Sequence, residues 1–212
     1  MTGADLLFDA ASHTYKTPAG VVVPSVTRIL RATGVSRDFG ALGGVSRKLK
    51  GDIELKGTLG DAVHQDAHAY DDDDLVMDSV HPDVLPYLNA WIAFRQNKRL
   101  HPLVRERRLF HPELGYCGTM DGLFACSTKV IEVDIKTGDP VSSAGQYRSM
   151  AYQVAYLREN PGAVIHERWC VWLQPDLKVP YRIYPYTDWQ DEMRWRAIVE
   201  TYYCGEPARR TL

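Results

Sequence analysis

The sequence contains few cysteines, and their spacing does not define a metal centre. Four cysteines stand at positions 117, 126, 170 and 204, and no two of them have C-x-x-C spacing. Zinc ribbons and iron–sulfur clusters draw their ligands from such close pairs, so neither is indicated. A chain of 212 residues does not need a disulfide framework to build a core. We expect reduced, mostly buried thiols and no iron–sulfur cluster.

Long hydrophobic runs are also missing. No apolar stretch approaches the roughly 18 residues that span a membrane as a helix. The first residues do not combine a basic start with an apolar run, which is the pattern of a secretory signal. We therefore expect no membrane partner and a cytoplasmic location.

The chain lacks a strong net charge, but its charges are segregated. The formal net charge is −2, which alone argues weakly against nucleic acid as a partner. Residues 28–56 and 95–108 are rich in Lys and Arg, whereas residues 61–83 carry many aspartates and no Lys or Arg. Basic segments can follow a phosphate backbone, and they also occur as solvated faces. We expect the acidic run 71–74 to be a solvated loop after a helix.

The composition is that of a globular protein, with 45% hydrophobic and 10% aromatic residues. We expect a single domain over residues 1–212. Its first part, residues 1–56, should hold a β-hairpin, a short helix capped by Ser25 and ended by Gly34, and a basic irregular segment. The core should occupy residues 57–204.

The order of the expected elements in the core indicates the fold class. Helices are expected at about 57–70, 82–98, 143–158 and 188–204. Strands are expected at about 102–110, 116–125, 129–136, 164–173 and 179–186. A three-strand meander, a helix and two further strands predict an α/β fold with a mixed central β-sheet flanked by helices.

The stretch from Gly118 to Gly138 carries the clearest chemical pattern. If a hairpin turns between Ser127 and Thr128, Asp121 lies opposite Asp134 on the neighbouring strand. Directly opposed side chains have Cβ atoms about 4.5–5.5 Å apart. Two carboxylates so close repel each other unless one is protonated or a cation lies between them.

A divalent metal ion resolves this repulsion. Carboxylate oxygens suit Mg²⁺ or Mn²⁺, and one or two ions are compatible with the pattern. Strand side chains alternate between faces, so Lys136 shares a face with Asp134 and lies beside the expected ion. Such an arrangement fits phosphodiester hydrolysis, which needs an activated water and neutralisation of developing negative charge.

These residues resemble a known family. The motif GTMDG, then VDIKTG, then a helix with Gln and Tyr, is similar to the PD-(D/E)XK nuclease superfamily, in its RecB-type and lambda-exonuclease-type branch. The helix GTLGDAVHQDAHAY and the start PSVT match further features of phage exonucleases. The resemblance covers about residues 8–200. It implies a restriction-endonuclease-like core and a DNA exonuclease of phage or bacterial recombination, replication or repair, in a bacterial or phage-infected cell.

The resemblance also implies roles for individual residues. Metal ligands would be His64, Asp121, Asp134 and the backbone carbonyl of Ile135, with Glu106 as a supporting acidic residue. Lys136 would position the attacking water. The Gln-and-Tyr helix is represented by Gln153 and Tyr156, while Gln146 lies nearer the lysine and is the alternative.

DNA is the expected partner, and its recognition should depend mainly on the backbone. Candidate contacts from the basic segments and the KTG turn are Arg28, Arg31, Arg47, Lys48, Lys50, Arg105, Arg107, Thr137 and Gly138. A homo-oligomer and a strand-annealing protein as partner rest on the resemblance alone. The direction of DNA digestion and the preference for duplex or single-stranded DNA are left open.

Two other interpretations stand beside the nuclease. His64 and His68 are four residues apart on one helix and superficially match the zinc motif H-E-x-x-H, but Gln65 stands where the catalytic glutamate is needed. The second alternative is a catalytically silent DNA-binding or assembly module of the same fold. The intact set of site groups argues against that module without excluding it.

Overall fold

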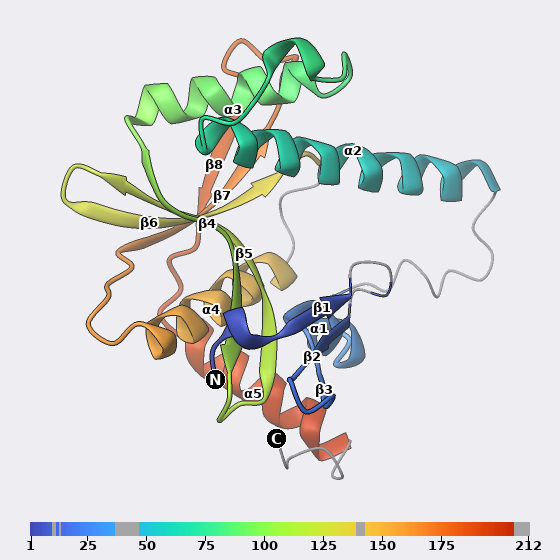
Figure 1. The fold of residues 1–212 in the computed structure, drawn as a ribbon, viewed down its shortest axis with the longest axis vertical. Helices are drawn as coiled ribbons and strands as arrows, with labels where there is room; N and C mark the ends of the chain where they lie inside the picture. Colours follow the sequence, from blue (N-terminus) through green and yellow to red (C-terminus); the bar gives the residue numbers. More distant parts are fainter. Residues whose placement is uncertain (10–11, 13, 37–46, 139–142, 206–212) are drawn as a thin grey trace.

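The computed structural model describes residues 1–9, 12, 14–36, 47–138 and 143–205, with the side chains of 47–57 and 143 outside the description (Figure 1). Its α-helices are α1 (Val26–Ala32), α2 (Arg47–Asp71), α3 (Leu85–Lys98), α4 (Ser143–Glu159) and α5 (Asp191–Gly205). Short 3₁₀ helices are η1 (Gly3–Asp5) and η3 (Met77–Ser79). The strands are β1 (Leu7–Asp9), β2 (Thr14–Lys16), β3 (Val22–Val23), β4 (His101–His111), β5 (Tyr116–Cys126), β6 (Lys129–Lys136), β7 (Glu167–Leu173) and β8 (Tyr181–Pro185).

A five-stranded mixed sheet forms the centre of the molecule, in the order β4-β5-β6-β7-β8. The meander β4-β5-β6 is antiparallel, β6 pairs with β7 in parallel through the crossover helix α4, and β8 is antiparallel to β7. The expected α/β fold with a mixed central sheet flanked by helices is therefore confirmed.

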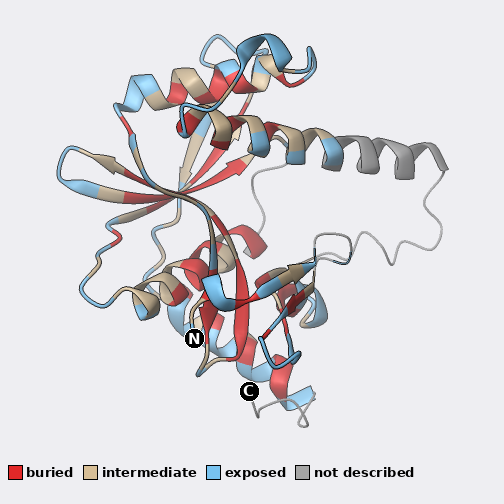
Figure 2. Cartoon of the chain, viewed as in Figure 1, coloured by how far each residue is buried: buried red, intermediate tan, exposed pale blue. Residues whose placement is uncertain are grey.

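Helices cover the sheet from two sides, as Figure 1 shows. One apolar cluster joins α2 and α3 to β6 and β7, and its buried members include Val63, Trp91 and Val133. The other joins α1, α4 and α5 to β5, with Ile29, Ala151 and Trp195 fully buried. In Figure 2 the buried residues accordingly follow the sheet and the inward sides of these helices.

A separate three-stranded antiparallel sheet, β1-β2-β3, packs beside α1. It is joined to the central sheet at β5, because Cys117 N–H donates to Pro24 O at 3.1 Å and the Tyr15 hydroxyl lies 2.9 Å from Thr119 Oγ1. Ser25 caps α1 as expected, accepting from Arg28 N–H at 3.2 Å. These contacts fix α1 against the end of β5 that carries Gly118 and Thr119.

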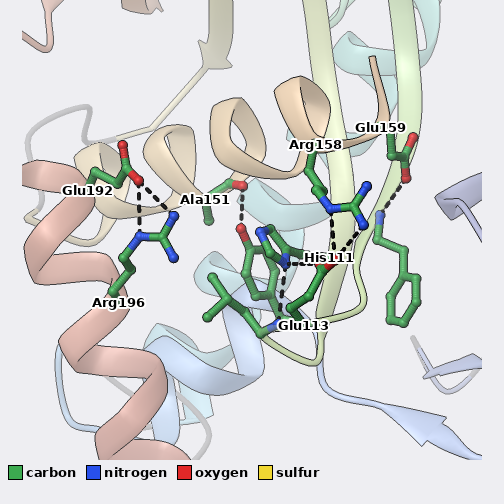
Figure 3. A network of polar contacts seen from close by, with 10 residues as sticks. His111, Glu113, Ala151, Arg158, Glu159, Glu192 and Arg196 are labelled. Atoms are coloured by element: carbon green, nitrogen blue, oxygen red, sulfur yellow. Dashed lines mark hydrogen bonds and ion pairs between the residues drawn. The ribbon is translucent and has the colours of Figure 1, made fainter. Parts of the chain in front are cut away.

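Polar contacts hold the far end of the β4–β5 hairpin to α4 (Figure 3). Glu159, at the end of α4, accepts from Phe110 N–H at 2.8 Å, and Arg158 pairs with Glu113 in the β4–β5 turn. The Tyr116 hydroxyl donates to Ala151 O at 2.9 Å. These contacts fix the middle and the C-terminal end of α4 against the hairpin.

Several local expectations were wrong. The helix α2 begins at Arg47 rather than Gly57, so residues 47–56 are helical rather than irregular and the expected boundary at residue 56 falls inside a helix. The helix α3 begins at Leu85 instead of Pro82, with Pro86 in its first turn. Asp71 is buried rather than solvated, because it accepts from Trp91 Nε1 at 3.3 Å and pairs with Arg95.

The four cysteines lie outside any disulfide; Cys117 and Cys170 are buried, Cys126 is partly buried and Cys204 is exposed. Among the described residues, no helix combines the length and apolar character needed to cross a membrane.

Candidate functional site

Three carboxylates lie in one row across neighbouring strands. The pairs Arg105–Gly122 and Arg107–Met120 flank Glu106, which places it opposite Asp121. Gly122 pairs with Val133, and extending this register by one residue places Asp121 opposite Asp134. The hairpin turns at Ser127 and Thr128, as expected. The carboxylate of Asp121 accepts from Ile135 N–H at 2.9 Å. The row Glu106–Asp121–Asp134 therefore spans β4, β5 and β6.

Two histidines of α2 face this row. Val63 and Ala67 point into the core with no exposure, so His64 and His68, one residue further along, lie together on the adjacent side of the helix. His64 Nδ1 is 3.6 Å from Asp121 Oδ2, and His68 Nδ1 is 3.7 Å from Glu106 Oε2. Burial lowers the pKa of His68, so its imidazole is neutral at pH 7.

Asp134 is held by two cations. Lys136 Nζ lies 2.7 Å from Asp134 Oδ1, and a terminal nitrogen of Arg148 lies 3.4 Å from the same oxygen. Burial alone would raise the pKa of the Asp134 carboxyl, but Lys136 and Arg148 outweigh it and hold the pKa below its ordinary value. The proximity of Asp134 in turn raises the pKa of Arg148. Asp134 is therefore ionised at neutral pH although it is buried.

The site opens into a cavity of about 680 Å³. Its lining comes from α1, α2, the meander and α4: Thr27, Asp61, His64, Gln65, His68, Glu106, Thr119, Asp121, Asp134, Lys136, Arg148 and Tyr152. A cavity of this size, with charged groups converging on it, has the character of a ligand site.

The oxygen atoms at this site fit a hard divalent cation. Lys136 Nζ donates both to Asp134 Oδ1, at 2.7 Å, and to Ile135 O, at 2.9 Å. The ammonium thus occupies a point where a carboxylate and a carbonyl oxygen converge, as they would on a metal ion. Among the described residues no three His, Cys, Asp or Glu side chains are already arranged as a complete metal-binding group. Binding would thus require Lys136 to release these oxygens.

The helix α4 does not present the expected Gln153, Gln146 and Tyr156 to the acidic cavity. Arg148 and Tyr152, four residues apart and hence on one face, line the acidic cavity. Gln153 lines a different cavity of about 380 Å³ beside Arg168. Gln146 contributes its backbone carbonyl to Arg168 at 3.0 Å, and Tyr156 packs against the apolar cluster of α4 and α5.

Tyr152 reaches the cavity because β5 has a glycine beneath it. A Cβ atom on Gly118 would lie 2.6 Å from Tyr152 Cε1, closer than any packed side chain allows. The i, i+4 spacing of Arg148 and Tyr152 is visible in the sequence, but the direction in which α4 presents the pair is not.

The predicted DNA-binding residues fall into three groups. Arg28 and Arg31 are exposed and line a second cavity, of about 790 Å³, that shares Thr27, Glu106, Thr119 and Tyr152 with the acidic one. Arg105 pairs with Asp72, and Arg107 lies 3.5 Å from Glu159, so both are engaged away from the cavity. The third group holds the remaining five. Thr137 Oγ1 faces Gly60 of α2, and Gly138 is exposed. The side chains of Arg47, Lys48 and Lys50 lie outside the described residues.

No protein-family model matches the chain, and neither does any curated protein in the comparison.

Proposed function

We propose that this chain is a metal-dependent deoxyribonuclease with a restriction-endonuclease-like core, acting on DNA ends. The observation that carries the proposal is the convergence of Asp121, Asp134, Lys136 and His64 on one cavity. They come from a helix and two adjacent strands of a mixed sheet whose element order agrees with that expected from the sequence. The resemblance of the GTMDG and VDIKTG motifs to PD-(D/E)XK nucleases supplies the reaction class.

The chemistry follows from the charges in the cavity. Asp121, Asp134, the carbonyl of Ile135 and His64 would hold Mg²⁺ or Mn²⁺, which when bound supplies Lewis acidity and a more acidic water. Lys136, released from Asp134, would donate a hydrogen bond that positions the attacking water. Arg148 places a second positive charge where the phosphate gains negative charge during hydrolysis.

Arginines extend the site toward α1. The second cavity meets the acidic one at Thr27, Thr119 and Tyr152, and Arg28 and Arg31 line it from α1. Neither Arg28 nor Arg31 forms an ion pair with any described residue. Exposed guanidinium groups of this kind bind phosphates well. A nucleic-acid strand would thus run from the carboxylate row past Tyr152 to α1.

One observation favours a second candidate, a catalytically silent DNA-binding module. Lys136 and Arg148 bring two positive charges to the carboxylate of Asp134. A site balanced in this way could bind a phosphate backbone and never turn over. The two candidates differ in one respect: only the nuclease cleaves DNA, so only there can a substitution abolish cleavage.

The test is degradation of end-labelled linear duplex and single-stranded DNA with Mg²⁺, Mn²⁺ or EDTA, beside a covalently closed circle. We expect metal-dependent loss of the linear substrates, an intact circle, and no cleavage by Lys136→Ala. Lys129→Ala is the matched control, because Lys129 is exposed at the other end of β6 and pairs with Glu167. Cutting of the circle would indicate an endonuclease. Absence of cleavage by folded protein that still binds DNA would establish the silent module instead.

A further inference from the structure

The strand β8 forms one edge of the central sheet and turns a row of backbone groups away from it. Just beyond the strand, Tyr186 N–H donates to Arg168 O at 2.9 Å. Since hydrogen-bonded positions alternate along an antiparallel strand, the even-numbered residues of β8 bond to β7 and the odd-numbered ones face outward. Tyr181 and Ile183 therefore present N–H and C=O groups at an edge where the described residues supply no further strand.

This edge has little protection against pairing with another strand. Natural sheets shield their edges with charged side chains, prolines or bulges. Arg182 is the only charged residue of β8, and Pro185 stands at its last position. Tyr181, Ile183 and Tyr184 are residue types that favour strands. The edge is thus able to accept a strand from another molecule.

Exposed apolar side chains lie beyond both ends of β8. In the β7–β8 turn, Leu177 is 39% exposed and Val179 is 55% exposed. Beyond the other end, Trp189 is 83% exposed and, together with Pro185, lines the cavity of about 380 Å³ beside α4. Large apolar groups gathered around an open edge are characteristic of an interaction surface.

The outward groups of β8 are self-complementary about Ile183, the central residue of the strand. In an antiparallel pair of two β8 strands centred there, Ile183 and the partner's Ile183 would each donate an N–H to the other's carbonyl. Tyr181 N–H would donate to the carbonyl of Pro185 of the partner subunit, so the missing N–H of the proline does not prevent the pairing. A second copy of this chain therefore fits the edge along its whole length.

The flanking residues are complementary in the same arrangement. Leu177 and Trp189 are equally far from Ile183 in sequence, so the turn of one copy would lie near the cavity at Trp189 of the other. Lys178 and Asp188 are also equally far from Ile183, which brings opposite charges together. Lys178 is exposed, and Asp188 keeps 40% of its side chain exposed beside its own arginine partner. A net charge of only −2 gives little repulsion between copies.

We propose that two copies of this chain form a symmetric dimer through edge-to-edge pairing of β8. Stable interfaces bury about 1,200–2,000 Å², more than two strands of five residues supply. The β7–β8 turn and Trp189 complete the interface, and the two central sheets become one continuous sheet. The acidic cavity lies over β4, β5 and β6, so it stays open in both copies. The dimer does not depend on the proposed function.

The test is sedimentation velocity of the full chain over a range of protein concentrations. The wild type should pass from monomer to dimer as the concentration rises. Trp189→Ala should raise the dimer dissociation constant by about 30-fold, as expected for a central aromatic residue, and Leu177→Asp should weaken the dimer similarly. Ile183→Pro should also weaken it, because it removes an outward N–H and no bond to β7. Leu103→Asp is the matched control, since Leu103 is an exposed leucine on β4 at the opposite edge.

Each outcome decides for or against this interface. Monomers at every concentration overturn the dimer. A dimer that is unchanged in both Trp189→Ala and Leu177→Asp, or that is lost only in Leu103→Asp, overturns its placement at β8. An unchanged dimer in folded Ile183→Pro overturns the strand pairing. Thermal unfolding shows whether each variant is folded, and the two surface variants test the proposal if Ile183→Pro does not fold.

Discussion

At the scale of single residues, the buried carboxyl of Glu132 in β6 makes the stability of the fold depend on pH. It is 1% exposed and bonded to the Ser149 hydroxyl, and burial raises its pKa to about 8. In the unfolded chain the pKa returns to about 4.5. Between these values the folded state holds a proton that the unfolded state has lost. The free energy of unfolding therefore falls as the pH rises from about 4.5 to 8.

Replacing Glu132 by Gln should remove much of this dependence, because the amide keeps a hydrogen-bonding group but does not ionise. We expect the variant to lose less stability than the wild type between pH 5 and pH 8, by an amount on the order of a few kcal/mol. Urea unfolding at both pH values measures it. Equal losses in the two proteins would show that Glu132 is ionised in the folded state.

Arg148 allows a second prediction at this scale. Removing the guanidinium in Arg148→Gln leaves the burial of Asp134 opposed by Lys136 and His64, so the pKa of Asp134 should rise. In the proposed nuclease the ionised carboxylate is the active form, so the acid limb of the pH–rate profile should move to higher pH. Cleavage at neutral pH should fall about 100-fold.

The profile of kcat/KM against pH checks this prediction, and Arg148→Lys is the matched variant because it keeps the charge. An unchanged acid limb in Arg148→Gln would mean that Lys136 alone keeps Asp134 ionised.

At the scale of elements, the contact between β5 and α4 depends on Gly118. In Gly118→Ala the new methyl group meets the Tyr152 ring at 2.6 Å, so the ring or the helix must shift. Overpacking of this kind costs about 1–3 kcal/mol. Gly138→Ala is the control, because a Cβ there meets nothing within 4 Å. Chemical denaturation of both variants measures the difference, and equal stabilities would show that Tyr152 moves freely.

The strands and the carboxylate row were predictable, because a two-residue turn and period-two alternation fix the partner of each residue in the β5–β6 hairpin. The register that pairs Gly122 with Val133 confirmed the expected opposition of Asp121 and Asp134. Glu106 could be placed only loosely from the sequence, since an irregularity at residues 102–104 shifts the β4–β5 register.

Helix limits and helix faces were harder to predict. Gly57 and Gly60 lie inside α2, although each glycine costs about 1 kcal/mol in a helix interior. The packing of Val63 and Ala67 against the sheet offsets that cost, and composition alone does not reveal it. Likewise, the face of α4 that meets the site is set by Ala151 and Ala155 in the core, which turns Arg148 rather than Gln153 toward Asp134.

At the scale of the whole molecule, the two cavities predict how the proposed DNA binding responds to salt. In the double variant Arg28→Gln and Arg31→Gln, affinity should fall for all sequences. The slope of log K against log salt should decrease by about 2, one unit for each lost phosphate contact. Arg182→Gln is the control, since Arg182 is exposed on β8 at the far edge of the sheet. Fluorescence anisotropy with EDTA present measures binding without cleavage. An unchanged slope would mean that DNA does not contact Arg28 and Arg31.

The parallel pairing of β6 with β7 has a consequence for how the molecule is made. The β5–β6 hairpin is local in sequence and can close within microseconds. A parallel pair forms only after the chain has traversed the whole crossover, here residues 137–166 with α4 among them. Asp121 and Asp134 therefore meet while the chain is still incomplete, and Arg148 arrives with the crossover. During synthesis Asp134 therefore has the counter-charge of Lys136, from its own hairpin, before it gains that of Arg148, which arrives only when α4 docks.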